Sequence, residues 1–198
     1  MQFKSEPLGS LFYFLKNQEP FILATDGIIE VPGIILIIVC LVRCAQYVMQ
    51  SHSKQSRYFW LASVLVFFAV IRRELNYLPE LFIPSDFSLL SHSYDWWEDS
   101  VLTIVYILIV GLLTYSWRYL WAVLKDVDVS IYVIVAVLAI IQYMGENAIV
   151  FPYAFGGIIE ESAETAIYGI ALIYLWKFKL ADFETQTTEN LDLETARR

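Results

Sequence analysis

Three carboxylates stand at the head of the last apolar stretch of the chain, GGIIEESAETAIYGIALIYLWKF. In a helix Glu160, Glu161 and Glu164 would lie close together, and a spacing of four puts Glu160 and Glu164 on the same face. Carboxylates crowded in a medium of low dielectric repel one another, so they can carry protons or bind a cation. No histidine or cysteine accompanies them, so as metal ligands these glutamates favour a hard divalent cation over zinc.

Two arginines offer the complementary charge. Arg72 and Arg73 precede Glu74 in the stretch IRRELNYLPEL. Guanidinium groups can neutralise part of a carboxylate excess, or they can hold a phosphate or carboxylate head group in bidentate fashion. Helical spacing adds further polar residues to the face of Arg73, namely Asn76, Tyr77 and Glu80. The sequence leaves open which of Arg72 and Arg73 faces the interior of the protein.

A third polar stretch, IIQYMGENAIVF, carries Gln142 and Glu146 four residues apart. The same spacing joins Glu160 to Glu164 and Tyr168. We expect these polar stripes to face one another in the folded protein. The binding cluster that they predict comprises Arg72, Arg73, Glu74, Glu146, Asn147, Glu160, Glu161 and Glu164.

The elements that must position this cluster are membrane-spanning helices. The 198 residues are 58% hydrophobic and 17% charged, and their mean hydropathy is +0.57, whereas soluble domains carry about 25% charged residues. Apolar stretches long enough to cross roughly 30 Å of hydrocarbon occur five times. They are residues 27–50, 58–82, 101–124, 129–150 and 157–178. The sequence therefore predicts an all-α integral membrane protein, a bundle of five transmembrane helices in residues 27–180.

Lysine and arginine beside these spans indicate their orientation. The first and third connections carry basic residues, as does the exit of the last span, whereas the second and fourth connections carry none. The positive-inside rule then puts the N-terminus outside and the C-terminus in the cytoplasm. Residues 1–26 are expected to form an interfacial segment, and residues 181–198 an acidic cytoplasmic tail. Trp60, Trp117, Trp121 and Trp176 would form the inner aromatic belt, with Trp96 and Trp97 in the outer one.

In this topology the polar stretches all fall in the outer half of the bilayer. A charged side chain at the centre of a membrane helix costs roughly 2.5 to 3.5 kcal/mol, so such side chains usually face a bundle interior or a water-filled cavity. Five carboxylates face only two guanidiniums in the predicted cluster. The excess favours a cluster that binds something, although interhelical ion pairs that only hold the helices together remain an alternative.

Three functions fit these features. The leading hypothesis is that the cluster binds a cation, a proton or a lipid head group. A second is a membrane-embedded lipid hydrolase or transferase in which one glutamate acts as general base. A third is a structural or accessory membrane subunit in which the cluster is an interhelical clamp. Whether the protein is an enzyme stays open, and no catalytic residue is assigned. The expected partners are the lipid bilayer, a lipid head group or another membrane protein. A nucleic acid is excluded by the sequence pI of about 4.7 and the dispersed basic residues.

The motifs RREL and EESAE carry a resemblance to a known group. They resemble small multi-pass bacterial inner-membrane proteins, which share an Arg-Glu pair in an early span and an acidic start to the last span. The matching residues here are Arg73 and Glu74, with Glu160, Glu161 and Glu164. The resemblance implies a location in the bacterial inner membrane and implies no activity.

Overall fold

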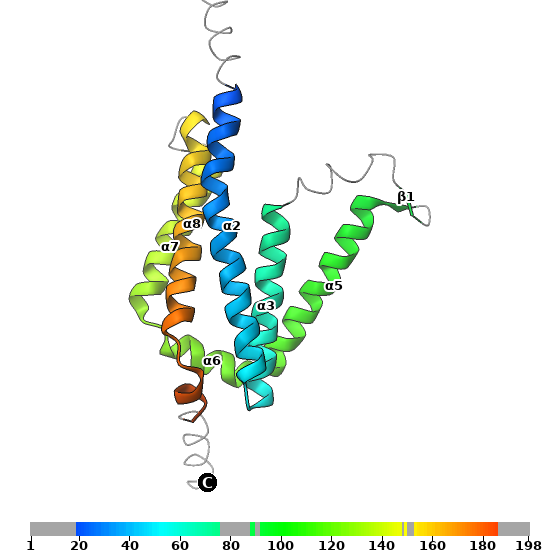
Figure 1. The fold of residues 1–198 in the computed structure, drawn as a ribbon, viewed down its shortest axis with the longest axis vertical. Coiled ribbons are helices and arrows are strands. Elements are labelled where there is room, and N and C mark those ends of the chain that lie inside the picture. The colour runs from blue at the N-terminus through cyan, green and yellow to red at the C-terminus, as the bar shows by residue number, and fades with distance from the viewer. Residues whose placement is uncertain (1–18, 76–87, 90–91, 148, 150–152, 186–198) are drawn as a thin grey trace, which may run out of the picture. The chain divides into compact units, whose positions relative to one another are not determined.

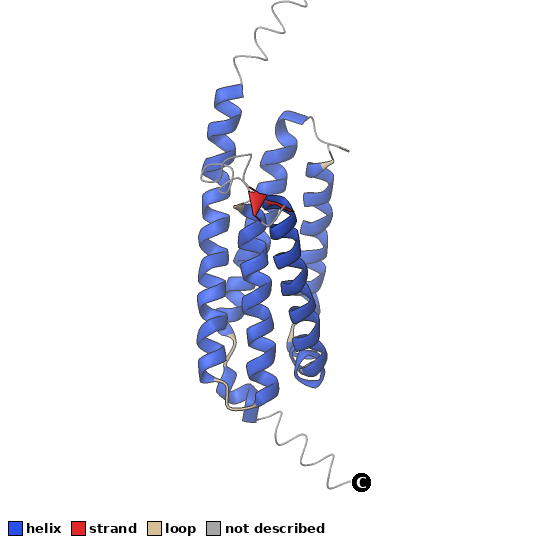
Figure 2. Ribbon diagram, turned by 90° about the vertical axis from the view of Figure 1, so that its right-hand side faces the viewer, coloured by secondary structure: helices blue, strands red, loops and turns tan. Residues whose placement is uncertain are grey.

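The described part of the chain is helical apart from one short pair of strands (Figure 2). The computed structural model describes residues 19–75, 88–89, 92–147, 149 and 153–185. Its helices are α2 (Glu19–Gln50), α3 (Lys54–Glu74), α5 (Tyr94–Tyr115), α6 (Trp117–Asp126), α7 (Val129–Glu146) and α8 (Tyr153–Lys177) (Figure 1). Strands β1 (Ser88–Leu89) and β2 (His92–Ser93) pair antiparallel just before α5. The predicted all-α class is confirmed for these residues.

Three of the helices are long and apolar enough to cross a membrane. They contain the segments Val31–Gln50 of α2, Trp96–Tyr115 of α5 and Val129–Glu146 of α7. Most apolar side chains of α5 are exposed, including those of Ile104 and Ile107. A helix with apolar residues on every side belongs in lipid, because water would not tolerate that surface. The length and composition of these three helices indicate a membrane protein.

Helices α3 and α8 are long but less apolar. They contain 21 and 25 residues, enough for roughly 30 Å at about 1.5 Å per residue. Charged residues lie within both: Arg72, Arg73 and Glu74 end α3, and three glutamates occupy the first half of α8. Several charged residues of the predicted cluster thus lie in α3 and α8, whereas α7 contributes only Glu146, at its end.

Several boundaries differ from those predicted. Helix α2 begins at Glu19, inside the segment expected to lie on the membrane surface. Residues 180–185 are helical, so the predicted tail begins with ordered structure. The expected span 101–124 is divided, because α5 ends at Tyr115 and α6 begins at Trp117. The buried Ser116 between them donates its hydroxyl to Leu112 O at 2.7 Å, a back-bond that bends helices. Residues 1–18, 76–82 and 186–198, which held other predicted features, lie outside the described residues.

The chain divides into two compact units. One, which we call the hairpin unit, comprises Met1–Gly33 and Ile134–Ile167. The other, the core unit, comprises Ile34–Val133 and Tyr168–Arg198. Helices α2, α7 and α8 each contribute residues to both. The residues of the predicted cluster are thus divided between the two units, since the arginines lie in the core unit and most of the glutamates in the hairpin unit.

The core unit is built around buried aromatic rings. The Trp60 ring lies 4.5 Å from that of Tyr47 and 5.2 Å from that of Phe178, measured between centroids. Cys40 and Cys44 are fully buried beside them and serve as small packing residues. The Tyr47 hydroxyl lies 2.6 Å from Leu175 O and 2.7 Å from Phe178 O. Its single proton is shared between these two carbonyls, which lie in the last turn of α8 and just after it, where carbonyls lack a partner within the helix.

In the hairpin unit α7 and α8 run antiparallel and approach closely. A Cβ atom placed on Gly156 would lie 2.6 Å from Gly145 O, and one on Gly145 would lie 2.8 Å from Gly156 O. Only glycine fits at such a distance from a neighbouring backbone, and small residues commonly bring membrane helices this close. The contact fixes the register of α7 against α8 and hence the level at which their polar residues meet.

Candidate functional site

The hairpin unit brings two of the predicted polar stripes together. The Gln142 side-chain amide of α7 donates a hydrogen bond to Glu164 of α8. This contact lies one turn from Gly145, whose neighbourhood includes the backbone nitrogen and the Cβ atom of Glu160. The polar residues of α7 and α8 were expected to face one another, and these two do. The contact joins a neutral amide donor on α7 to a carboxylate acceptor on α8.

The other residues of the predicted cluster in this unit differ in exposure. Glu160, Glu161 and Glu164 are all half-buried, and each takes part in polar or electrostatic interactions. Glu146 and Asn147, at the end of α7, are exposed. The Asn147 side chain donates to Tyr143 O at 2.9 Å, which caps the helix end and leaves the amide in a structural role. Among the predicted cluster residues of this unit, the three carboxylates of α8 are thus more shielded than Glu146 and Asn147.

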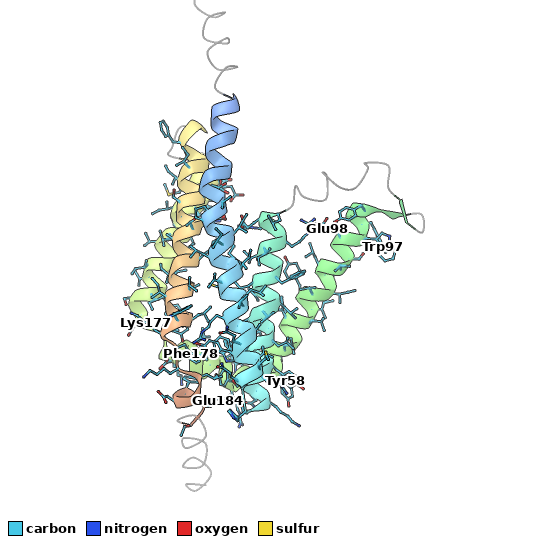
Figure 3. All side chains as sticks on the ribbon, viewed as in Figure 1. Tyr58, Trp97, Glu98, Lys177, Phe178 and Glu184 are labelled. Atoms are coloured by element: carbon cyan, nitrogen blue, oxygen red, sulfur yellow. The ribbon has the colours of Figure 1, made fainter. Side chains whose placement is uncertain are left out.

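In the core unit Arg72 joins two helices. Its guanidinium forms an ion pair with Glu98, in the first turns of α5, and also donates to Leu75 O at 3.3 Å. Figure 3 places Glu98 near the start of α5, beside Trp97. The side chains of Arg72 and Glu98 are only 21% and 23% exposed, so the pair is largely shielded. Sequence reasoning missed Glu98 as a partner, because it lies beyond the connection after α3 and no spacing rule relates it to Arg72.

Arg73 has a different environment from Arg72. Its guanidinium pairs with the adjacent Glu74 at 2.9 Å, and its side chain is 62% exposed. The same Glu74 oxygen accepts a hydrogen bond from the Tyr168 hydroxyl of α8 at 3.1 Å. The structure thus answers the question that the sequence left open, since Arg72 is the more shielded arginine. Asn76, Tyr77 and Glu80, which were expected on the same face as Arg73, lie outside the described residues.

A metal centre is not evident in the part of the chain that the structure describes. Within residues 19–75, 92–147 and 153–185 no group of three or more histidine, cysteine, aspartate or glutamate side chains is arranged to hold a metal ion. Glu160, Glu161 and Glu164, considered above as ligands of a hard divalent cation, do not form such a group. A cation held by these glutamates would therefore need further ligands, such as water, as magnesium commonly keeps.

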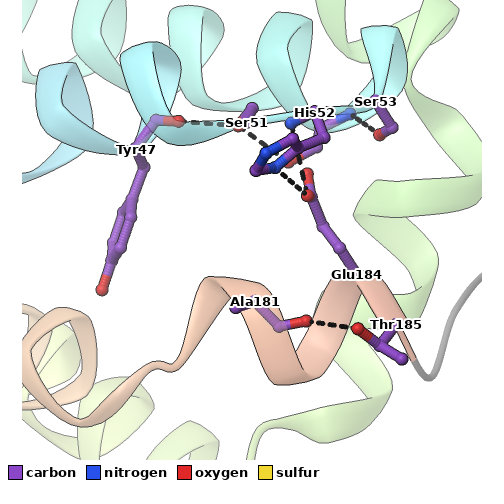
Figure 4. A network of polar contacts seen from close by, with 8 residues as sticks. Tyr47, Ser51, His52, Ser53, Ala181, Glu184 and Thr185 are labelled. Atoms are coloured by element: carbon purple, nitrogen blue, oxygen red, sulfur yellow. Dashed lines mark hydrogen bonds and ion pairs between the residues drawn. The ribbon is translucent and has the colours of Figure 1, made fainter.

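A second polar network lies at the opposite end of α3 (Figure 4). Glu184, from the helical turn 180–185, accepts a hydrogen bond from the His52 backbone nitrogen at 3.3 Å and lies 3.5 Å from His52 Nδ1. The Ser51 hydroxyl donates to Tyr47 O at 2.6 Å. These contacts bind the start of the tail to the turn between α2 and α3. The signal in the sequence was Phe183, an aromatic residue in an otherwise acidic tail, whose ring packs 5.4 Å from Tyr119.

The unequal shielding of the two arginines has a measurable consequence. We expect Arg72→Leu to lower the free energy of unfolding by about 1 to 3 kcal/mol, because it leaves the shielded Glu98 carboxylate without its charged partner. Arg73→Leu removes a more exposed pair and should cost less than about 1 kcal/mol. Thermal unfolding of both variants in nanodiscs measures the difference.

A double substitution isolates the ion pair itself. Glu98→Gln in the Arg72→Leu background should recover part of the lost stability, since the neutral amide needs no counter-charge. Equal losses for Arg72→Leu and Arg73→Leu, or no recovery in the double variant, would show that the pair with Glu98 does not stabilise the fold.

The comparisons with known proteins leave the chain without a family assignment. No family model, no curated protein and no solved structure matches it.

Proposed function

We propose that α2, α3, α5, α7 and α8 all cross the bilayer, with the N-terminus outside and the C-terminus in the cytoplasm. Residues 27–180 would then form the transmembrane domain. Basic residues support this orientation: Lys54 and Arg57 lie in the first turn of α3, Lys125 in the last turn of α6 and Lys177 at the end of α8. The resemblance in RREL and EESAE favours the bacterial inner membrane as the location.

We propose further that the glutamates of the hairpin unit bind a cation, a proton included. The observation that carries the proposal is the presence of three half-buried carboxylates, Glu160, Glu161 and Glu164, within five consecutive residues of α8. Like charges one helical turn apart repel one another at low dielectric, and a bound cation or proton relieves that repulsion. The amide of Gln142 positions Glu164 without neutralising it.

The arginines are less suited than the glutamates to bind a ligand. Arg72 pairs with Glu98, and Arg73 pairs with Glu74. A lipid phosphate would have to displace a carboxylate from either guanidinium. The lipid head group expected as one possible ligand of the cluster is therefore a weaker proposal than a cation.

Thermal unfolding in nanodiscs tests the cation site. The purified protein is titrated with sodium, potassium, magnesium, calcium and manganese salts at matched ionic strength, over a range of pH. A ligand that binds only the folded protein raises stability by mass action, by about 2.7 kcal/mol at a concentration 100 times the dissociation constant. We expect one cation, or protons alone, to give a saturable rise that is lost in Glu161→Gln and Glu164→Gln.

A matched control separates the site from general charge effects. Glu146→Gln removes the same charge from the exposed end of α7 and should leave the saturable rise intact. For protons, infrared difference spectra would show the carbonyl stretch of a protonated carboxyl group, lost in the variant that lacks it. If neither cations nor protons shift the unfolding transition, or if Glu146→Gln acts like Glu164→Gln, the proposed site is wrong.

The contacts in the core unit favour a second function, that of an interhelical clamp. Arg72 connects α3 to α5 through Glu98, and Glu74 connects α3 to α8 through Tyr168. Both contacts join two different helices, as expected of polar groups that stabilise a membrane bundle. Under this alternative Glu164→Gln and Arg72→Leu would both lower the unfolding temperature, and no ligand would restore it.

A further inference from the structure

Helix α6 has two chemically different faces. Tyr119 and Val123 are buried in the core unit, only 2% and 5% exposed. The opposite face carries Trp117 and Trp121, which are 58% and 49% exposed and stacked with their ring centroids 5.9 Å apart. Leu124 lies on the same side, seven residues after Trp117. A large apolar surface thus remains outside the protein core.

Basic residues border this exposed face. Arg118 and Lys125 are both exposed, and Lys125 Nζ lies 5.8 Å from the centre of the Trp121 ring. At about 100° per residue, Asp126 lies about half a turn away from Trp117. On the buried side, desolvation raises the pKa of Tyr119 to about 12, so that ring stays neutral. The charge beside the two indoles is therefore positive.

The structure holds α6 in a defined orientation. The bend at Ser116 turns the chain away from the axis of α5, so that α6 runs across the direction of α5 (Figure 1). The Phe59 ring of α3 packs 5.3 Å from that of Tyr119 on the buried face. At the far end the Tyr132 hydroxyl donates to Leu124 O at 2.7 Å. The exposed indoles are thus presented by a helix that is fixed at both ends and along its inner face.

The position of α6 in the chain indicates what covers its exposed face. It joins α5 and α7, two helices that are long and apolar enough to cross a membrane. With 10 residues it extends about 15 Å, half the thickness of the hydrocarbon. A short helix between two spans lies at the membrane surface, where tryptophan and basic side chains are favoured.

We propose that α6 is an in-plane interfacial helix whose exposed face binds the head groups of anionic phospholipids. The indoles of Trp117 and Trp121 insert at the level of the head groups. Arg118 and Lys125 contact the lipid phosphates on the same side. This site lies in the core unit and differs from the proposed cation site in both residues and ligand.

Lipid titration of the full-length protein tests the site. In neutral detergent, phosphatidylglycerol should raise the unfolding temperature by about 5 to 10 °C at saturation, and phosphatidylcholine should raise it much less. The double variant Arg118→Gln/Lys125→Gln should lose most of the rise given by phosphatidylglycerol. The matched control Lys54→Gln/Arg57→Gln removes the same charge from exposed positions at the start of α3. This control should keep the rise in unfolding temperature that phosphatidylglycerol gives.

Spin labels provide a second measurement that does not depend on stability. A nitroxide at Trp121→Cys in nanodiscs should be more accessible to oxygen than to a polar nickel complex, and one at Lys54→Cys should show the reverse. Cys40 and Cys44 are fully buried and should not react with the label.

The proposal is overturned if the label at position 121 resembles the label at 54, or if both double variants lose the lipid effect equally. It is also overturned if phosphatidylcholine stabilises as strongly as phosphatidylglycerol. The proposed cation site would stand in each of these cases, because Glu161 and Glu164 are untouched.

Discussion

Alanine at Gly156 should destabilise the protein by about 1 to 3 kcal/mol, the usual cost of an added group in a packed contact. The added Cβ atom would lie 2.6 Å from the carbonyl oxygen of Gly145, closer than any ordinary contact. The obstacle is backbone, so it cannot rotate away as a side chain would. Helices α7 and α8 must therefore move apart, and the hydrogen bond between Gln142 and Glu164 is the first contact expected to suffer.

The residue next to it offers a matched control. A Cβ atom on Gly157 would have no neighbour within 4 Å, and alanine is favoured over glycine inside a helix by roughly 0.5 to 1 kcal/mol. Gly157→Ala should therefore leave the unfolding temperature unchanged or raise it slightly, while Gly156→Ala lowers it. Thermal unfolding of both variants in the same nanodiscs measures this. Equal unfolding temperatures for the two would contradict the close approach of α7 and α8.

The effect should extend to the proposed cation site. Separation of α7 from α8 displaces Gln142 from Glu164, so any cation that stabilises the protein should bind Gly156→Ala more weakly than Gly157→Ala. A Gly156→Ala protein that is destabilised but binds the cation as before would place the site on α8 alone.

The sequence predicted most of the helices because apolar length is a property of composition. The predicted span 129–150 and the observed α7 begin at the same residue. The break at Ser116 was not predictable in this way, since the apolar residues of α6 follow those of α5 with only Ser116 and Arg118 between them, and a scan for length joins the two helices. A scan for length cannot distinguish a helix that continues through the membrane from one that turns along its surface.

The candidate site was predictable only where spacing along one helix determines it. The stripes of Gln142 and of Glu164 followed from intervals of four, and the structure brings these two residues together. Spacing did not show which of Arg72 and Arg73 is shielded. Adjacent residues point about 100° apart on a helix, and the partner side chain determines which of the two is covered. That partner, Glu98, belongs to another helix. Contacts between distant helices are a property of the packed fold.

Trp60 is a similar case, and it yields the prediction with the largest expected effect. The sequence predicted its level in the membrane, in the inner aromatic belt, but not its packing: it is 2% exposed and lies among the rings of Tyr47, Phe59 and Phe178. Trp60→Ala should cost about 3 to 5 kcal/mol, because it removes a large buried ring and leaves a cavity. Loss of the Trp60 side chain should also loosen the end of α8, since Tyr47 bonds the carbonyls of Leu175 and Phe178 from one side of the same cluster.

Trp176→Ala is the matched control for this substitution. Trp176 is 68% exposed, and its ring centroid lies 5.7 Å from the Arg43 guanidinium, a contact worth about 0.5 to 1 kcal/mol at an exposed position. Thermal unfolding in nanodiscs should therefore show a much larger fall for Trp60→Ala than for Trp176→Ala. Hydrogen exchange should rise in residues 180–185 of the Trp60→Ala protein, because Phe183 packs on Phe178, the neighbour of Trp60. Similar losses for the two tryptophans would mean that the rings around Trp60 do not form the core of this unit.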